Sequence, residues 1–330
     1  MKLRGEKAGF TIIELLTVMS IIVILISIMV PALNKVRRFA KVVGQKGQFN
    51  EISKGMELYR NEHEETYPDS GAFDLTNPAI GYCGAMKLCE AMLGQDGMGF
   101  HPDSRFLADA TTSGPPTNPD LYPFDLCVTT DPSLYNGSPP PRPDLAASLR
   151  ERKKYIDTEN IKPVRLQDIY EWSVTSGSSF TGVAFQGGDL LKYPNSVISD
   201  VFLHPQIKAT WCPPRAGDKV GMPVLYYKAD PSKLSHDADI PTLMDNIYNF
   251  DDNWAITALG CPWETGAGPT TLQPLWDNAA PIPGKLFYQI TQNDRITSTP
   301  RPHNEDGYIL ISAGYDGLYG TRDDVYNFAD

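Results

Sequence analysis

The residue that points most clearly to chemistry is Glu14, the only charged residue among the 24 residues from 10 to 33. As a helix, this apolar stretch would be about 36 Å long, which is enough to cross the hydrocarbon core of a bilayer. A carboxylate inside such a span is costly to bury and usually has a partner or a function. The nine residues before the stretch are short and basic. The pattern therefore predicts a membrane-inserted helix in which Glu14 has a specific role.

Simpler interpretations of the same stretch stay open. A basic head before an apolar segment is typical of a secretory signal, but this segment is too long for one and no A-x-A-like cleavage site follows it. An uncleaved signal anchor fits the length and composition. In that case the Glu14 side chain would only reach the cytoplasmic headgroups and would have no pairing role.

Residues 9–16, with the sequence Gly-Phe-Thr-Ile-Ile-Glu-Leu-Leu, carry a more specific pattern. This segment resembles the processing site of type IV pilins and type II secretion pseudopilins. In that family a prepilin peptidase cuts after the glycine, on the cytoplasmic side, and methylates the new N-terminal residue. The resemblance implies cleavage between Gly9 and Phe10 and methylation of Phe10. Removal of nine residues from 330 would leave a mature chain of 321.

The resemblance also implies a role for Glu14 in assembly. Cleavage would create a positive amine on Phe10, and Glu14 would lie one helical turn away on the same face. In the family this glutamate pairs with the N-terminal amine of a neighbouring subunit, an attraction that is strong at low dielectric constant. The implied partners are prepilin peptidase, other pilin or pseudopilin subunits in a homo- or hetero-oligomeric filament, the inner-membrane secretion platform and membrane lipid.

The C-terminal segment 307–328 is the second region whose residues suggest chemistry. Its glycine-rich loop is similar to the calcium-binding loop near the end of the major pseudopilin, although the spacing of an EF-hand is absent. Calcium takes six to eight oxygen ligands. The alternative is a glycine-rich turn with solvated aspartates. The ligand set that we expect for a structural Ca²⁺ is the Leu310 carbonyl, the Ser312 hydroxyl, Asp316, Asp323 and Asp324.

No catalytic motif supports an enzyme: H-E-x-x-H, G-x-S-x-G and a phosphate loop are all absent. The acidic segments 236–239 and 249–253 could bind a cation but are more often solvated loops.

The five cysteines would lie outside the cytoplasm, where disulfides persist. Two bridges among Cys83, Cys89, Cys127, Cys212 and Cys261 allow fifteen pairings. Cys83 and Cys89 cannot pair within one helix.

Charge divides the chain sharply. The net charge is −11, yet residues 1–46 carry eight Lys or Arg and two Glu, so the other 284 residues carry −17. Such an acidic body repels nucleic acid, and no nucleic-acid partner is expected. Basic residues flank both ends of the apolar stretch, which leaves the positive-inside rule ambiguous. The family resemblance implies a single-pass protein of the bacterial inner membrane, with its head in the periplasm and assembled into a pilus or pseudopilus.

The elements that position these residues begin with one long helix over residues 10–65, which Tyr67-Pro68 stops. Residues 10–34 form its transmembrane part, and Pro31 predicts a kink or local melting there. Residues 35–66 form an amphipathic stalk, whose apolar residues recur at intervals of three or four. The apolar stripe consists of Phe39, Val42, Val43, Phe49, Ile52, Met56 and Tyr59.

The remaining residues 67–330 predict an α+β head in which the long helix packs on an antiparallel sheet with extensive loops. We expect helices over 85–93 and 145–155 and strands over 197–203, 223–228, 286–290 and 308–312. Whether the head is one domain or two stays open.

These observations predict a pilin-like structural subunit of a type II secretion system and not an enzyme. The size of the head suggests a minor or tip subunit, whereas Glu14 favours a position within the filament. The alternatives are a minor pilin of a type IV pilus, in adhesion or DNA uptake, and a membrane-anchored extracytoplasmic binding protein or enzyme.

Overall fold

The computed structural model divides into two compact units, Met1–Val43 and Gly44–Asp330. It describes residues 11–71, 82–95, 97–104, 106, 150–157, 161–170, 196–204, 207, 218–237, 245–257, 260, 262, 274–275, 284–296 and 299–328. The predicted leader at residues 1–9 lies outside these ranges.

A single helix, α1 (Ile12–Glu62), starts in the first unit and ends in the second. This confirms the long helix expected over residues 10–65. The observed helix is two residues shorter at its N-terminal end and three residues shorter at its C-terminal end. Its N-terminal part exposes apolar side chains, and its most apolar 18-residue window has none of its residues buried. The helix is long and apolar enough to cross a membrane.

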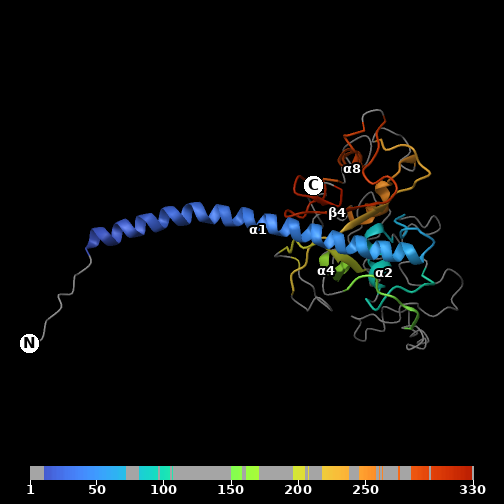
Figure 1. Cartoon of the computed structure of the whole chain (residues 1–330), viewed down its shortest axis with the longest axis horizontal. Helices are drawn as coiled ribbons and strands as arrows, with labels where there is room; N and C mark the ends of the chain where they lie inside the picture. The colour runs from blue at the N-terminus through green and yellow to red at the C-terminus, as the bar shows by residue number, and fades with distance from the viewer. Residues whose placement is uncertain are drawn as a thin grey trace, which may run out of the picture. The chain divides into compact units, whose positions relative to one another are not determined.

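Helical geometry continues through Pro31, so the local melting expected at this proline is absent from the isolated chain. Proline removes one backbone donor, which would otherwise bond to the Ser27 carbonyl. The bonds on either side remain and hold the 51-residue helix together. Figure 1 shows the ribbon of this part running on without a break.

The C-terminal part of α1 packs within the second unit. Phe49, Ile52 and Met56 are buried, as the stripe predicted. The N-terminal members of the stripe differ: Phe39 and Val43, which belong to the first unit, are 70% and 53% exposed. The predicted buried stripe is therefore confirmed only from Phe49 onwards.

In the described part of the head, two small antiparallel sheets lie together with short helices, which confirms the α+β class. In the first, β1 (Lys162–Arg165) pairs with β2 (Ser196–Ser199). In the second, β4 (Tyr308–Ser312) lies between β3 (Leu225–Lys228) and β5 (Val325–Tyr326). Every residue of β4 is buried, as expected of a central strand that is covered on both faces.

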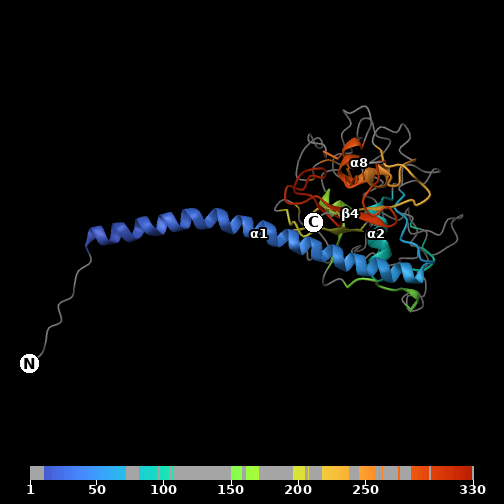
Figure 2. The same cartoon turned by 45° about the horizontal axis from the view of Figure 1, so that its top comes forward.

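The two sheets are joined where the chain leads into β3. A bridge pairs Ser199 with Pro223, and the Val224 N–H donates to the Ile198 carbonyl at 2.8 Å. Helix α2 (Gly84–Leu93), as predicted, contacts β2 and β3 and lies beside the C-terminal part of α1 in both views (Figures 1 and 2). The head also contains α4 (Leu166–Ile169), η3 (Phe250–Asn253), α7 (Trp254–Thr257) and α8 (Lys285–Thr291).

Three predicted elements are wrong in whole or in part. The strand expected over 286–290 is helix α8, whose buried residues Phe287, Tyr288 and Thr291 share one helical face. The helix expected over 145–155 is helical at 150–151, but Lys153 pairs instead in a β-bridge with Phe100; residues 145–149 lie outside the described ranges. A short apolar run does not by itself distinguish helix from strand.

The strand expected over 197–203 stops at Ser199 because Asp200 turns the chain. Its carboxylate Oδ1 accepts hydrogen bonds from the backbone N–H groups of Phe202, at 3.0 Å, and Met222, at 3.2 Å. A side chain that bonds to nearby backbone in this way competes with the sheet ladder.

Candidate functional sites

The start of α1 holds Glu14 through a reciprocal arrangement with Thr11. Glu14 Oε2 accepts from the Thr11 backbone N–H at 2.9 Å and from the Thr11 hydroxyl at 2.8 Å. The Glu14 N–H donates to Thr11 Oγ1 at 3.3 Å. This is a capping box, and the Thr-x-x-Glu spacing of residues 11–14 is its signature in the sequence. The carboxylate is thereby held at the N-terminal end of the helix; Gly9 and Phe10 lie outside the described residues.

A buried pair of glutamines joins α1 to the end of β2. The Gln45 side-chain amide donates to Gln48 Oε1 at 2.8 Å, and the Gln48 amide donates to the Ser199 carbonyl at 2.9 Å. The Val201 N–H in turn donates to Gln45 Oε1 at 2.9 Å. Both glutamines are almost fully buried. They satisfy backbone groups at the end of β2 that would otherwise be buried without partners.

Gly55 allows α1 to approach the head closely. A Cβ at this position would overlap the Ile156 side chain and lie 2.9 Å from Met92 Sδ of α2. A glycine inside a helix ordinarily weakens it, but here the missing side chain makes room for a contact. Gly47, by comparison, faces open space.

The C-terminal end of α1 is held by Lys153 and Tyr155. Glu62 forms an ion pair with Lys153 and accepts from the Tyr155 hydroxyl at 2.9 Å. The Lys153 hydrogen bond lowers the Glu62 pKa below its usual value. Tyr59 stacks on His63, with ring centroids 4.0 Å apart, and meets Tyr155 edge to face. The end of the helix is therefore fixed by both charge and ring packing.

The chain leaving α1 is fixed across β3 by a buried polar network. The Tyr226 hydroxyl donates to the Pro68 carbonyl at 2.6 Å. Ser70 donates to the carboxylate of Asp252 and accepts from the Lys228 N–H at 2.8 Å. Burial raises the pKa of Asp252 to about 7. The acidic segment 249–253 is thus part of the core at this residue and not a solvated loop.

The other acidic segment, 236–239, is likewise more buried than expected at its first residue. His236 is 1% exposed, and its Nε2 lies 2.8 Å from the Thr291 hydroxyl. Burial lowers the His236 pKa to about 4, so this imidazole is neutral at pH 7. Tyr248, Phe287 and Tyr288 surround the ring. It packs as a core residue.

In the C-terminal loop, Asp316 and Asp323 come together. Asp323 Oδ2 accepts from the backbone N–H groups of Tyr315, at 2.6 Å, and Asp316, at 2.9 Å. Asp316 Oδ1 accepts from the Leu318 N–H at 2.8 Å. Burial raises the pKa of Asp316, and its repulsion by Asp323 adds to the shift. The loop therefore concentrates negative charge.

Asp324 adds a third carboxylate that is only half satisfied. Its Oδ2 accepts from the Gly320 N–H at 2.8 Å and the Tyr326 hydroxyl at 3.0 Å. Its Oδ1 is buried without a hydrogen-bond partner. Burial raises the Asp324 pKa to about 7, and repulsion by Asp323 and Asp316 contributes. An unpartnered buried oxygen near two further carboxylates is what a bound cation would compensate.

The other two expected calcium ligands, Ser312 and Leu310, make hydrogen bonds to other residues of the head. The Ser312 hydroxyl donates to Asp200 Oδ2 at 2.8 Å. The Leu310 carbonyl accepts from the Asn327 N–H at 3.4 Å. Among the residues that the structure describes, no group of three or more His, Cys, Asp or Glu side chains is arranged to hold a metal. Of the five expected ligands, Asp316, Asp323 and Asp324 lie close together in the loop, whereas the Ser312 and Leu310 oxygens each take part in a hydrogen bond elsewhere.

Cys83 and Cys89 are buried and form no disulfide. Burial raises the Cys83 pKa to about 12 and the Cys89 pKa also rises, so both thiols stay protonated in the core. The other three cysteines lie outside the described residues.

No family model matches the chain, and no curated protein and no solved structure is significantly similar to it.

Proposed function

We propose that this protein is a pilin-like structural subunit, a pseudopilin of a type II secretion system, and not an enzyme. The observation that carries the proposal is the capped start of an exposed apolar helix, where Thr11 holds Glu14 next to the expected cleavage junction. The basic leader and the Gly9–Phe10 pair before it support the same function.

The proposed mechanism begins with processed subunits in the inner membrane, their heads in the periplasm. Prepilin peptidase cuts after Gly9 and methylates the Phe10 amine. The Glu14 carboxylate then attracts the positive amine of a neighbouring subunit, and the low dielectric constant of the membrane strengthens this attraction. The subunits then assemble into a filament through packing of their apolar helices.

The helix-to-head junction suits this mechanical role. Polar contacts at Gln45, close packing at Gly55 and the ion pair at Glu62 fasten α1 to the head at three points along its C-terminal part. A force applied along the helix is therefore shared among several contacts and does not act on one.

We propose that the C-terminal loop binds a structural Ca²⁺ through Asp316, Asp323 and Asp324. Bound there, the ion would supply positive charge to three mutually repelling carboxylates and a partner to Asp324 Oδ1. The loop follows β4 directly, so the ion would stabilise the end of the central sheet.

The experiment that tests the proposed function is the intact mass and N-terminal peptide of the protein from its native membrane. We expect a chain that starts at Phe10 with one added methyl group. A chain that starts at Met1, in cells where the peptidase is active, would overturn the proposal and leave residues 1–34 as an anchor only.

A type IV pilus subunit would give the same N-terminal peptide. The two machines are distinguished by deleting the gene for this chain: a secretion subunit is needed for protein export, whereas a pilus subunit is needed for surface pili. We expect the export defect.

A further inference from the structure

A polar groove beside α1 suits a cationic side chain. Its volume is about 420 Å³, and it opens between Ser53 of α1 and the segment that precedes β4. Its walls include Tyr67, Tyr308, Asn304, Asn327, Glu305 and Asp306. Two aromatic rings and two carboxylates are the groups that bind ammonium and guanidinium ions.

One carboxylate of this groove is open to a partner. Asp306 is exposed, whereas Glu305 already forms an ion pair with Arg301 at 3.2 Å. The Tyr67 ring meets Tyr308 edge to face at 5.0 Å. The guanidinium of Arg60 already lies 5.2 Å from the centre of the Tyr67 ring, so the ring accepts a cation in the isolated chain.

A rigid cationic segment lies elsewhere on the same head. Residues 150–154 have the sequence Arg-Glu-Arg-Lys-Lys, four basic residues of five in a body that is otherwise strongly acidic. Two backbone hydrogen bonds, of 2.8 and 3.1 Å, hold Lys153 against Phe100. The Tyr155 N–H donates to the Met92 carbonyl at 3.0 Å. A Cβ at Gly99 would lie 3.2 Å from the Lys153 backbone, so the segment is also closely packed.

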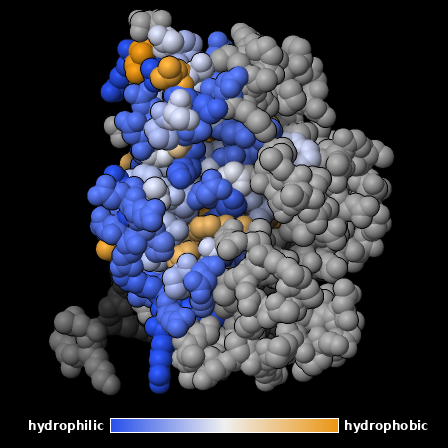
Figure 3. Space-filling view, turned by 90° about the vertical axis from the view of Figure 1, so that its right-hand side faces the viewer, coloured by the Kyte–Doolittle hydropathy of each residue, from blue (hydrophilic) through white to orange (hydrophobic). Residues whose placement is uncertain are grey.

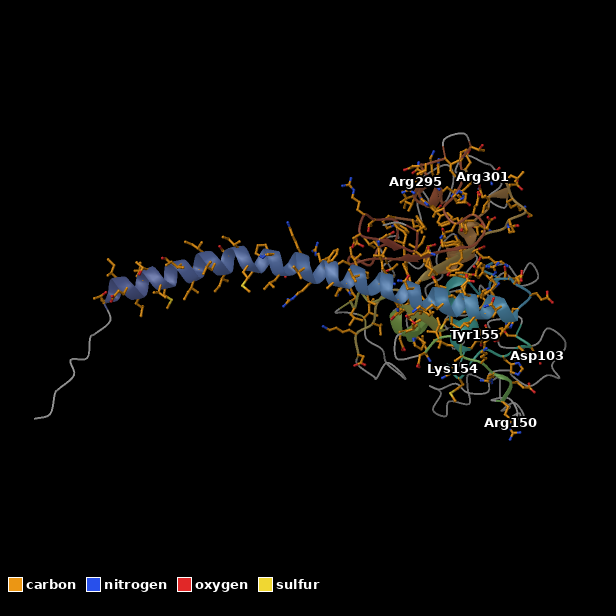
Figure 4. The ribbon with its side chains drawn as sticks, viewed as in Figure 1. Asp103, Arg150, Lys154, Tyr155, Arg295 and Arg301 are labelled. Atoms are coloured by element: carbon orange, nitrogen blue, oxygen red, sulfur yellow. The ribbon has the colours of Figure 1, made fainter. Side chains whose placement is uncertain are left out.

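Only part of the segment's charge faces away from α1. Lys153 and Tyr155 both contact Glu62 on the helix. Successive side chains of an extended segment point in opposite directions, so Lys154 points outward, and it is exposed. Arg150 and Lys154 lie on one side of α1, and Arg301, which pairs with the groove residue Glu305, lies on the other (Figure 4).

We propose that the cationic segment 150–154 of one copy docks into the groove at residues 304–308 of a second copy. The two surfaces are complementary in charge and lie on opposite sides of the head, so each copy can use both at once. Such a head-to-tail contact repeats from copy to copy and generates an open filament when the rotation between copies does not close a ring. The inference rests on the proposed function, because a filament brings identical heads together. It supplies an attraction between heads whose net negative charges repel.

The test is zero-length carbodiimide cross-linking of the full-length chain in membranes, with equal amounts of isotopically light and heavy protein. We expect a heavy-to-light linked peptide that joins Lys154 to Asp306 or Glu305. Lys154→Glu removes the amine that forms the link and therefore abolishes it. Arg150→Glu keeps that amine and should lower the yield about ten-fold, because like charges then meet in the groove. Lys233→Glu makes the same charge change on another loop and should leave the yield unchanged.

A mixture of the Lys154→Glu and Asp306→Lys variants should restore a link between positions 154 and 306. Absence of the heavy-to-light link, or linkage of Lys154 to other carboxylates only, would overturn the docking contact. The N-terminal peptide of the same sample shows whether the docking contact or the proposed processing has failed. A processed chain without the link rejects only the contact, whereas a link formed by a chain starting at Met1 rejects only the processing.

Discussion

Glu14 and Thr11 hold each other in place at the start of α1. Both hydrogen bonds from Thr11 end on Glu14 Oε2, so the carboxylate already has a fixed orientation in which the proposed partner subunit would meet it. The same bonds satisfy backbone groups at the start of the helix, which are otherwise without intrahelical partners.

We predict that Thr11→Val impairs filament incorporation while leaving processing largely intact, because valine keeps the shape but loses the hydroxyl. The loss of a cap costs about 1 kcal/mol. Thr11→Ser, which keeps the hydroxyl, is the matched control and should assemble normally. Glu14→Ala should be processed but fail to incorporate. The readout is the ratio of processed to unprocessed chain together with cross-linked multimers; normal multimers from Glu14→Ala would count against the pairing role.

Asp252 predicts a pH dependence of head stability. Its pKa is raised to about 7 by burial, while an unfolded chain has the ordinary value near 3.8. Between these values the folded state holds a proton that the unfolded state has lost, so stability falls as the pH rises from about 4 to about 7. Asp252→Asn resembles the protonated form and should show a smaller drop in Tm between pH 5 and pH 8. An equal drop in both proteins would contradict the assignment.

The elements of the head are held by α1, whose C-terminal turns form one wall of the core. Phe49, Ile52 and Met56 bury their side chains there, and Gly55 lets the backbone approach Ile156 and Met92. Packing of this kind is sensitive to a single added methyl group.

The matched pair Gly55→Ala and Gly47→Ala tests this packing. Alanine favours a helix by up to about 1 kcal/mol over glycine at either position. At Gly47 nothing lies within 4 Å of the added Cβ, so we expect a small rise in Tm. At Gly55 the Cβ overlaps Ile156, and overpacking costs about 1–3 kcal/mol. We therefore expect Gly55→Ala to lower Tm; an equal rise in both variants would show that the contact is loose.

Calcium removal tests the loop after β4. A chelator should lower the Tm of the head, because an ion that binds only the folded state stabilises it by mass action. Asp324→Asn should abolish the response to calcium and raise the Tm measured without it, since the unpartnered carboxylate is gone. Asp218→Asn, in an exposed residue elsewhere, is the control. No response of the native chain to calcium would remove the proposed site.

The whole molecule consists of two units, with the apolar turns of α1 in one and the folded head in the other. The described surface of the head that Figure 3 shows is mostly hydrophilic, with isolated hydrophobic residues. The apolar turns of α1, in contrast, expose many large side chains. The surface of the second unit is therefore suited to water, and that of the first unit to a membrane or a filament core.

A truncation pair tests this division. A fragment starting at Gly44 keeps Gln45 and the buried face of α1, so we expect a soluble head with cooperative melting. A fragment starting at Thr66 loses Phe49, Ile52 and Met56, each worth about 2–5 kcal/mol in a core. That loss is comparable to the whole stability of a typical domain, so this fragment should not fold. Circular dichroism melts of both fragments give the answer, and a folded Thr66 fragment would contradict the role of α1 in the core.

The sequence by itself determined the long helix, the apolar segment and Glu14 within it, the strand 308–312, and the C-terminal part of the strand expected over 223–228, which is observed as Leu225–Lys228. These are local patterns, and hydrophobic periodicity reports them directly. The prediction from hydrophobic periodicity was wrong at 286–290, because the run Leu-Phe-Tyr-Gln-Ile suits a strand as well as a helix. Packing of Phe287 and Tyr288 against the core favours the helix.

Only the tertiary structure decided how distant residues meet. Gln45 reaches Val201, Ser70 reaches Asp252, and Glu62 reaches Lys153. No spacing in the sequence encodes these pairs, because each depends on how the head folds back against α1. The same holds for the calcium ligands: the sequence brought five candidates together, and the fold turned the Ser312 hydroxyl to Asp200 and left an oxygen of Asp324 buried without a partner. Burial and hydrogen bonding depend on the whole structure, and they decide which of the candidate groups is open to a ligand.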